Sequence, residues 1–149
     1  GALLSSGTAA EALKPVQGEL LSQLVAFGFE PDGVAQPDLF GGTVRIWVVP
    51  ESNGECGGSI SSCPTHRLLF AYVTGDLYQK PVVFQLPPAK GWEFVGWSEA
   101  PAESAAFSVR TALPSANIDP EERAAWKPVE YRIVVSETSA TVNAVDRDA

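Results

Sequence analysis

The sequence has no methionine, a single histidine (His66) and only two cysteines, and it lacks any apolar run of the roughly 20 residues that cross a bilayer. The missing apolar run excludes a transmembrane helix. With one histidine, a metal site with several imidazole ligands is excluded, and a catalytic imidazole could only be that of His66. Basic residues are also scarce, since 10 Lys and Arg stand against 18 Asp and Glu, for a net charge of -8. That charge repels nucleic acid and anionic lipid, so we expect neither as a partner.

The remaining composition is that of an ordinary globular domain. With 149 residues, 45% of them hydrophobic and 19% charged, the chain is long enough to bury one core. No repeat or low-complexity linker divides it, so we expect a single domain over residues 1–149, with frayed ends at 1–8 and 146–149. Residues 1–7 are too short and too polar to be an intact export signal.

The two cysteines enclose a short loop of small residues. Cys56 and Cys63 flank Gly-Gly-Ser-Ile-Ser-Ser, which bends easily, and this predicts a disulfide that stabilises the fold by about 2.5 kcal/mol on the chain-entropy model. The alternatives are two unpaired buried thiols, a zinc half-site or a redox pair, but zinc needs about four ligands and redox pairs are usually spaced by two residues. A lasting disulfide implies a periplasmic or extracellular protein.

Two segments carry helical signals. Apolar residues recur at helical spacing from Leu13 to Phe27, which predicts an amphipathic helix that starts near Thr8 or Pro15 and ends at Gly28, where a left-handed glycine is expected. Further along, Asp119, Pro120 and Glu122 form the pattern of an N-cap, a first-turn proline and a capping box. This second helix should span residues 120–126.

Between and after these helices the apolar period changes to two, which is typical of strands. Residues 67–73 are apolar on both faces, as in a central strand covered from both sides. The seven predicted strands lie at 43–49, 67–73, 82–86, 92–97, 106–111, 129–135 and 140–145. Turns are expected at 30–33, 37–42 and 74–76, and most links between strands are short, which favours antiparallel neighbours. The expected fold is α+β: a mainly antiparallel sheet of about seven strands with the N-terminal helix packed on one face, and a two-sheet β-sandwich as the alternative.

Two features are candidates for binding. Trp92 and Trp97 belong to an aromatic strand in which Trp92 and Phe94 share one face and Trp97 the other, and exposed tryptophans stack on sugars or anchor protein interfaces. The alternative is that both tryptophans fill the core. The loop at 50–64, with Ile60 near its tip, is the second candidate, because a loop stiffened by a disulfide loses little entropy on binding.

No catalytic constellation is evident. There is no nucleophile elbow and no glycine-rich phosphate loop, and His66 has no recognisable triad partner in sequence. Glu93, Glu99, Glu103 and Glu130 lie in or near strands, and a pair of them in a cleft is the pattern of glycoside hydrolysis. With 18 acidic residues, however, chance pairs are expected. We therefore predict no enzyme activity, no catalytic or metal-binding residues and no cofactor.

The order of helix, strand, cysteine-bounded loop and strand resembles the Ivy family of periplasmic lysozyme inhibitors. The likeness covers roughly a third of the chain and includes an arginine four residues beyond the second cysteine, in Cys63-Pro64-Thr65-His66-Arg67. That family carries Lys-Pro-His-Asp between its cysteines, which this chain lacks. The residues thus predict an exported binding domain for another envelope protein or a cell-wall carbohydrate. The alternatives are an inhibitor of a hydrolase such as lysozyme and a small hydrolase using His66 or paired carboxylates.

Overall fold

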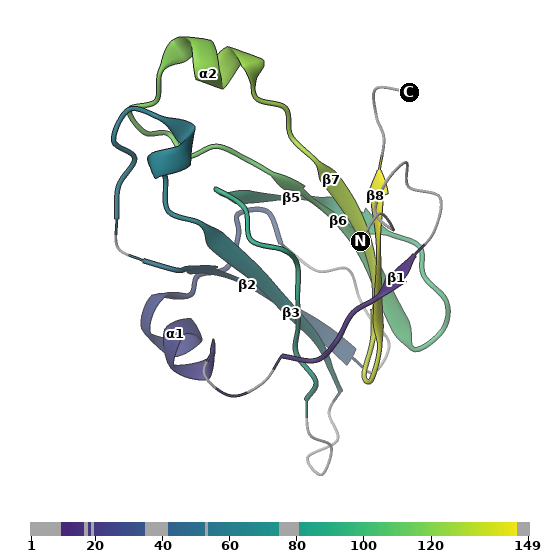
Figure 1. Ribbon diagram of the computed structural model, residues 1–149. Coiled ribbons are helices and arrows are strands. Elements are labelled where there is room, and N and C mark those ends of the chain that lie inside the picture. Colours follow the sequence, from purple (N-terminus) through teal and green to yellow (C-terminus); the bar gives the residue numbers. More distant parts are fainter. Residues whose placement is uncertain are drawn as a thin grey trace.

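The chain folds into two antiparallel β-sheets that share one hydrophobic core (Figure 1). The computed structural model describes residues 10–16, 18, 20–34, 42–52, 54–74 and 81–145. One sheet has five strands in the order β1-β8-β7-β6-β5, and the other has three in the order β2-β3-β4. The strands are β1 (Glu11–Ala12), β2 (Gly42–Pro50), β3 (His66–Thr74), β4 (Phe84–Gln85), β5 (Trp92–Ser98), β6 (Ser104–Thr111), β7 (Glu130–Ser136) and β8 (Ala140–Val145). The helices are α1 (Leu20–Phe27) and α2 (Pro120–Ala125), with a 3₁₀ turn, η2, at Ile60–Ser62.

All seven predicted strands are present, and β1 is an eighth that the sequence pattern did not predict. They do not form the expected single sheet. The alternative of two sheets is the arrangement found, because the apolar residues that alternate along β2 and β3 face those of β6 and β7 across one core.

Aromatic rings from both sheets meet at the centre of this core. Phe70 of β3 and Phe107 of β6 are almost fully buried and meet edge to face, with ring centroids 5.6 Å apart. Phe84 of β4 contacts Phe70 at 5.9 Å. The contact between Phe70 and Phe107 joins the three-stranded sheet to the five-stranded one, and the contact with Phe84 lies within the three-stranded sheet.

The central strand β3 is covered on both faces, as its apolar sequence predicts. Leu68, Phe70 and Tyr72 belong to the shared core, and the alternate residues Leu69 and Ala71 are also buried. On the outer side, Leu69 lines a small apolar cavity of about 100 Å³ together with Val16, Leu20, Leu21, Leu24 and Val83. The segment around α1 therefore lies over part of the outer face of this sheet.

The predicted N-terminal helix is wrong in its start. β1 pairs with β8, and the N–H of Leu13 donates to Ala140 O over 3.0 Å, so this part of the apolar stripe is extended. Pro15 has no N–H to offer a helix and disfavours a helical conformation in the residue before it. The helix begins only at Leu20.

The helix that does form is short, and its apolar stripe is only partly used. Leu21, Val25 and Phe27 are exposed, Val25 to 80%, so a long helix packed by one face on the sheet is not found. The end before Gly28 agrees with the prediction, but Gly28 does not adopt the left-handed conformation. Its N–H donates to Leu24 O, and a Cβ at Gly28 would lie 2.6 Å from that oxygen. Close approach, not a positive φ, requires glycine here.

The turn predicted near Asp32 is present, and Gly33 has the positive φ of 85° that such turns use. The expected frayed termini at 1–8 and 146–149, and the turn positions at 37–41 and 75–76, lie outside the described residues. None of the helices in the described ranges is long and apolar enough to span a membrane.

Candidate functional site

The two cysteines are bonded to each other, as the sequence predicts. The ring closed by Cys56 and Cys63 also contains hydrogen bonds of its own. The N–H of Gly57 donates to Ser62 Oγ over 2.7 Å, and that hydroxyl donates to Ser59 O over 2.7 Å. Side-chain hydroxyls therefore satisfy backbone groups that the short loop leaves outside any sheet.

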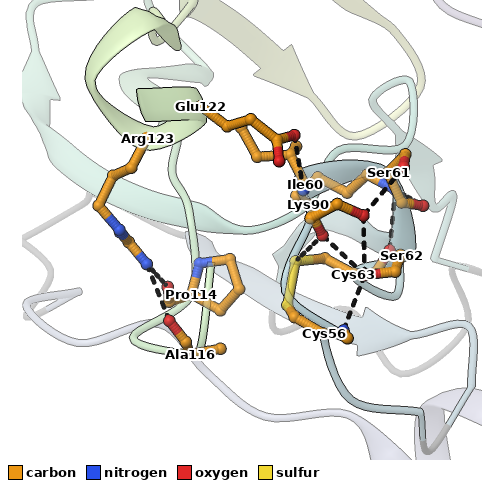
Figure 2. Close-up of a disulfide and its surroundings, with 12 residues drawn as sticks. Cys56, Ile60, Ser61, Ser62, Cys63, Lys90, Pro114, Ala116, Glu122 and Arg123 are labelled. Carbon is orange, nitrogen blue, oxygen red and sulfur yellow. Dashed lines mark hydrogen bonds between the residues drawn. A yellow bond between two sulfur atoms is a disulfide. The ribbon is translucent and has the colours of Figure 1, made fainter. Parts of the chain in front are cut away.

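The disulfide loop is held against α2 and is not a free protrusion (Figure 2). Gly58, which has a φ of 95°, forms a parallel bridge with Ile118, and the N–H of Asp119 donates to Gly58 O over 2.7 Å. Glu122, in the first turn of α2, accepts the N–H of Ile60 over 3.2 Å. Two hydrogen bonds thus connect a loop and a helix about 60 residues apart in the chain.

These contacts correct the predicted capping box. Asp119 precedes α2 and Pro120 opens it, as expected, but the Asp119 side chain makes no capping hydrogen bond. Glu122 does not return to the Asp119 N–H, because that N–H is already bonded to Gly58 O. The carboxylate accepts from Ile60 instead. The residue pattern predicted the helix start correctly and the partner of Glu122 wrongly.

Two cations complete the support of this region by binding backbone carbonyls. Lys90 Nζ donates to Cys63 O over 2.8 Å, at the end of the loop. Arg123 of α2 extends in another direction, where its Nη2 donates to the carbonyls of Pro114 (2.8 Å) and Ala116 (3.2 Å). Figure 2 shows Glu122 and Lys90 directed at the disulfide loop and Arg123 directed away from it.

Residues 57–62 and α2 together form a surface that we call the loop platform. The predicted binding residue Ile60 lies in it and is half-buried, whereas Gly57, Ser61 and Ser62 are exposed. All residues of α2 except Glu122 are exposed. The platform is thus a small, mainly polar surface on a backbone fixed by the disulfide and by hydrogen bonds.

Trp97 of β5, which was also predicted to bind a partner, packs against the core. Strict alternation places Phe94 and Trp97 on opposite faces, but β5 has a bulge between Phe94 and Gly96. The extra residue brings both rings to one face, where their centroids are 5.2 Å apart and each contacts Phe107. Val95 is the exposed residue of this segment. The predicted division of faces was therefore wrong.

Trp92 connects the two sheets near the end of the disulfide loop. Its ring is half-buried and contacts Tyr131 at 5.9 Å, and its Nε1 donates to His66 O over 3.0 Å. Burial raises the pKa of the Tyr131 phenol above its ordinary value of 10.0. His66 pairs with Ala89 in an isolated bridge, and its buried Nδ1 has no hydrogen-bond partner. Trp92 and Trp97 therefore contact residues outside the loop platform.

The four glutamates singled out in the sequence have separate surroundings. Glu93 pairs with Arg110, Glu130 is buried, and Glu99 and Glu103 are exposed. Among the described residues, no group of three or more His, Cys, Asp or Glu side chains is arranged to hold a metal ion.

The sequence did not reveal the contacts of two residues that hold the disulfide loop in place. Lys90 lies 27 residues beyond Cys63, and the Glu122 carboxylate binds a residue 62 positions earlier. The only local signal for Lys90 was its place in a proline-rich turn, which does not indicate a contact. The spacing of Glu122 from Asp119 did predict a hydrogen bond, but one within the N-cap of α2 and not one to Ile60.

Fold and site define a two-sheet β-protein with a disulfide-closed loop supported by a helix. Comparisons of the chain with protein-family models, with curated proteins and with solved structures found no match. The geometry of the molecule is therefore the basis for assigning a function.

Proposed function

We propose that this chain is an exported, non-enzymatic binding domain that uses the loop platform to bind another protein of the cell envelope. The observation that carries the proposal is that the loop is fixed from three directions: by the Cys56–Cys63 bond, by the Ile60–Glu122 hydrogen bond and by Lys90. A loop fixed before binding loses little conformational entropy in the complex. The disulfide supports export, because such bonds persist in oxidising compartments.

The charges of the loop platform favour a partner with basic side chains. Lys90 and Arg123 both donate to backbone carbonyls of this chain. Asp119 and Glu121, beside the uncharged residues of the loop, are exposed. The net charge of -8 adds a field of the same sign, which accelerates encounter with a basic surface.

A protein partner is favoured over a glycan because the two candidate tryptophans are engaged within the fold. Trp97 contacts Phe94 and Phe107, and Trp92 contacts Tyr131 and donates its N–H to the backbone. Stacking on a sugar needs an open, flat ring face.

A binding role is also favoured over hydrolysis. A catalytic histidine needs a group that orients one ring nitrogen, usually a carboxylate. The Nδ1 of His66 is buried without such a partner, and Glu93 of β5 is ion-paired with Arg110.

The proposal is tested with a double variant of the platform. Ser61→Arg with Ala124→Arg adds two large cations at exposed positions, one on the loop and one on α2. The matched control is Thr138→Arg, an exposed residue of the β7–β8 turn, which lies at the other end of the molecule (Figure 1). Oxidised protein is immobilised, envelope proteins of the source organism are cross-linked to it, and the recovered protein is purified for affinity measurement.

The purified partner should bind the wild type and Thr138→Arg equally, and the double variant at least about tenfold more weakly. Raising the salt concentration should weaken wild-type binding, because exposed charges are screened. Equal affinity for the double variant and the wild type, or a partner that does not bind when purified, would contradict the proposal.

A further inference from the structure

Where the edges of the two sheets approach each other lies a pocket that, unlike the apolar cavity beside α1, has charged residues in its lining. β1 is an edge strand of the five-stranded sheet, and β4 is an edge strand of the three-stranded one. The chain after β1 crosses from one to the other: the N–H of Leu13 donates to Ala140 O beside β1, and the N–H of Val16 donates to Val83 O beside β4. Figure 1 shows this purple segment running across the molecule between the sheets.

A pocket of about 420 Å³ opens beside this crossing, and we call it the seam pocket. Its apolar lining includes Leu13, the buried Leu86 and Val142, and the exposed Pro87. Pockets that hold small organic molecules usually have volumes of about 300 to 1,000 Å³ and a mainly apolar wall with a few polar groups. The seam pocket has these properties.

The polar groups of the seam pocket are unusual because two of their atoms lack hydrogen-bond partners. Gln85 Oε1 is buried and unpaired, and Arg67 Nε, which lies 3.4 Å from a carboxylate oxygen of Glu51, makes no hydrogen bond. Buried polar atoms in folded proteins are nearly always paired, so such atoms at the wall of a pocket indicate a group that enters it. The lining also includes Lys14, which is exposed at the rim, and Glu11.

We infer that the seam pocket binds a small organic acid that carries a hydroxyl group close to its carboxylate, as a sugar acid does. The ligand hydroxyl donates to Gln85 Oε1, which needs a donor. The ligand carboxylate accepts from Lys14 and from Arg67, whose Nε also lies 3.4 Å from a carboxylate oxygen of Glu51. The carbon skeleton then covers the apolar wall. A simple cation fits poorly, since two of the lining side chains repel it.

The test uses D-glucuronate as the probe and glucose, which has a neutral hydroxymethyl group in place of the carboxylate, as its match. Binding is followed by the amide NMR shifts of the intact oxidised protein. Glucuronate should shift the amides of Leu13, Gln85 and Leu86 in a saturable manner, and glucose should bind at least about tenfold more weakly. No saturable shift with glucuronate, or equal binding of the two sugars, would overturn the inference.

Single variants test the contributions of the cation Lys14 and of the hydrogen-bond acceptor Gln85 separately. Lys14→Met and Gln85→Leu should each weaken glucuronate binding by roughly tenfold, and Lys14→Arg should restore most of it. Lys127→Met removes an exposed lysine that does not line the pocket, and it should leave binding unchanged. Wild-type affinity in the double variant Lys14→Met with Gln85→Leu would refute the assignment. The seam pocket shares no residue with the loop platform, so either proposal can fail without the other.

Discussion

At the scale of single residues, Glu122 shows how a local pattern is read correctly for one purpose and wrongly for another. Its spacing from Asp119 predicted the start of α2, which is where the helix begins. Its hydrogen bond goes to Ile60, because Gly58 O has taken the backbone N–H that a capping box would use. Sequence spacing contains no information on a competitor from another part of the chain.

Replacing Glu122 by alanine should remove this hydrogen bond between helix and loop. We expect the free energy of unfolding to fall by about 1 kcal/mol, since the lost bond joins a carboxylate to a half-buried backbone N–H. Glu121→Ala removes the neighbouring, exposed carboxylate and should change stability by less than about 0.5 kcal/mol. Urea denaturation of both variants gives the comparison. Equal losses would mean that only the charge near the helix start matters.

Tyr131 gives a prediction for alkaline pH. Burial holds the folded-state pKa of its phenol above the value of 10.0, so the unfolded chain loses this proton first as the pH rises. The contribution of the neutral phenol to stability is therefore complete below about pH 10 and is lost as the pH rises through the folded-state pKa. This contribution is measured by urea unfolding of the wild type and of Tyr131→Phe from about pH 8 to about pH 11. The stability difference should be constant up to about pH 10 and then shift in favour of the phenylalanine variant; a constant difference throughout would disprove the assignment.

At the scale of secondary-structure elements, the strands were more predictable than the helices. Alternation of apolar residues located every predicted strand to within about three residues, because one face of each strand meets the core. β1 was missed because its two residues are too few to show a period, and their partner, β8, lies at the other end of the chain. The bulge in β5 escaped for a related reason, since its effect on Trp97 depends on the register with β6.

Two glycines, one directly before β5 and one within it, should differ in their sensitivity to replacement by alanine. A Cβ at Gly91 would lie 2.8 Å from Ala112 O, in a backbone contact where the Ala112 N–H also donates to Gly91 O. Gly91→Ala should therefore lower the free energy of unfolding by about 1 to 3 kcal/mol. A Cβ at Gly96, in the bulge of β5, meets nothing within 4 Å, so Gly96→Ala should remain within about 0.5 kcal/mol of the wild type. Thermal unfolding would show the contrast, and similar losses at both positions would contradict this account of close approach.

At the scale of the whole molecule, the contacts between segments that are far apart in the chain could not be predicted from the sequence. The disulfide was predictable, because Cys56 and Cys63 are close in sequence and separated by small residues. The contacts that fix its loop join Gly58 to Ile118 and Cys63 to Lys90, and they depend on how the two sheets are placed relative to each other. The choice between one sheet and two was open for the same reason. Periodicity identifies the buried face of a strand but not the strand opposite it.

The proposed binding surface depends on a disulfide loop that is held in one conformation against α2. Amide hydrogen exchange in the oxidised protein, and in the variant with both Cys56 and Cys63 replaced by serine, tests this most directly. The amides of Ile60 and Asp119, which donate to Glu122 and Gly58, should exchange at least about tenfold more slowly than in an unstructured chain. They should lose that protection in the serine variant, while amides of the interior strand β6 keep theirs. If Ile60 and Asp119 exchange at unstructured rates in the oxidised protein, the loop is not fixed and the proposed binding surface does not exist.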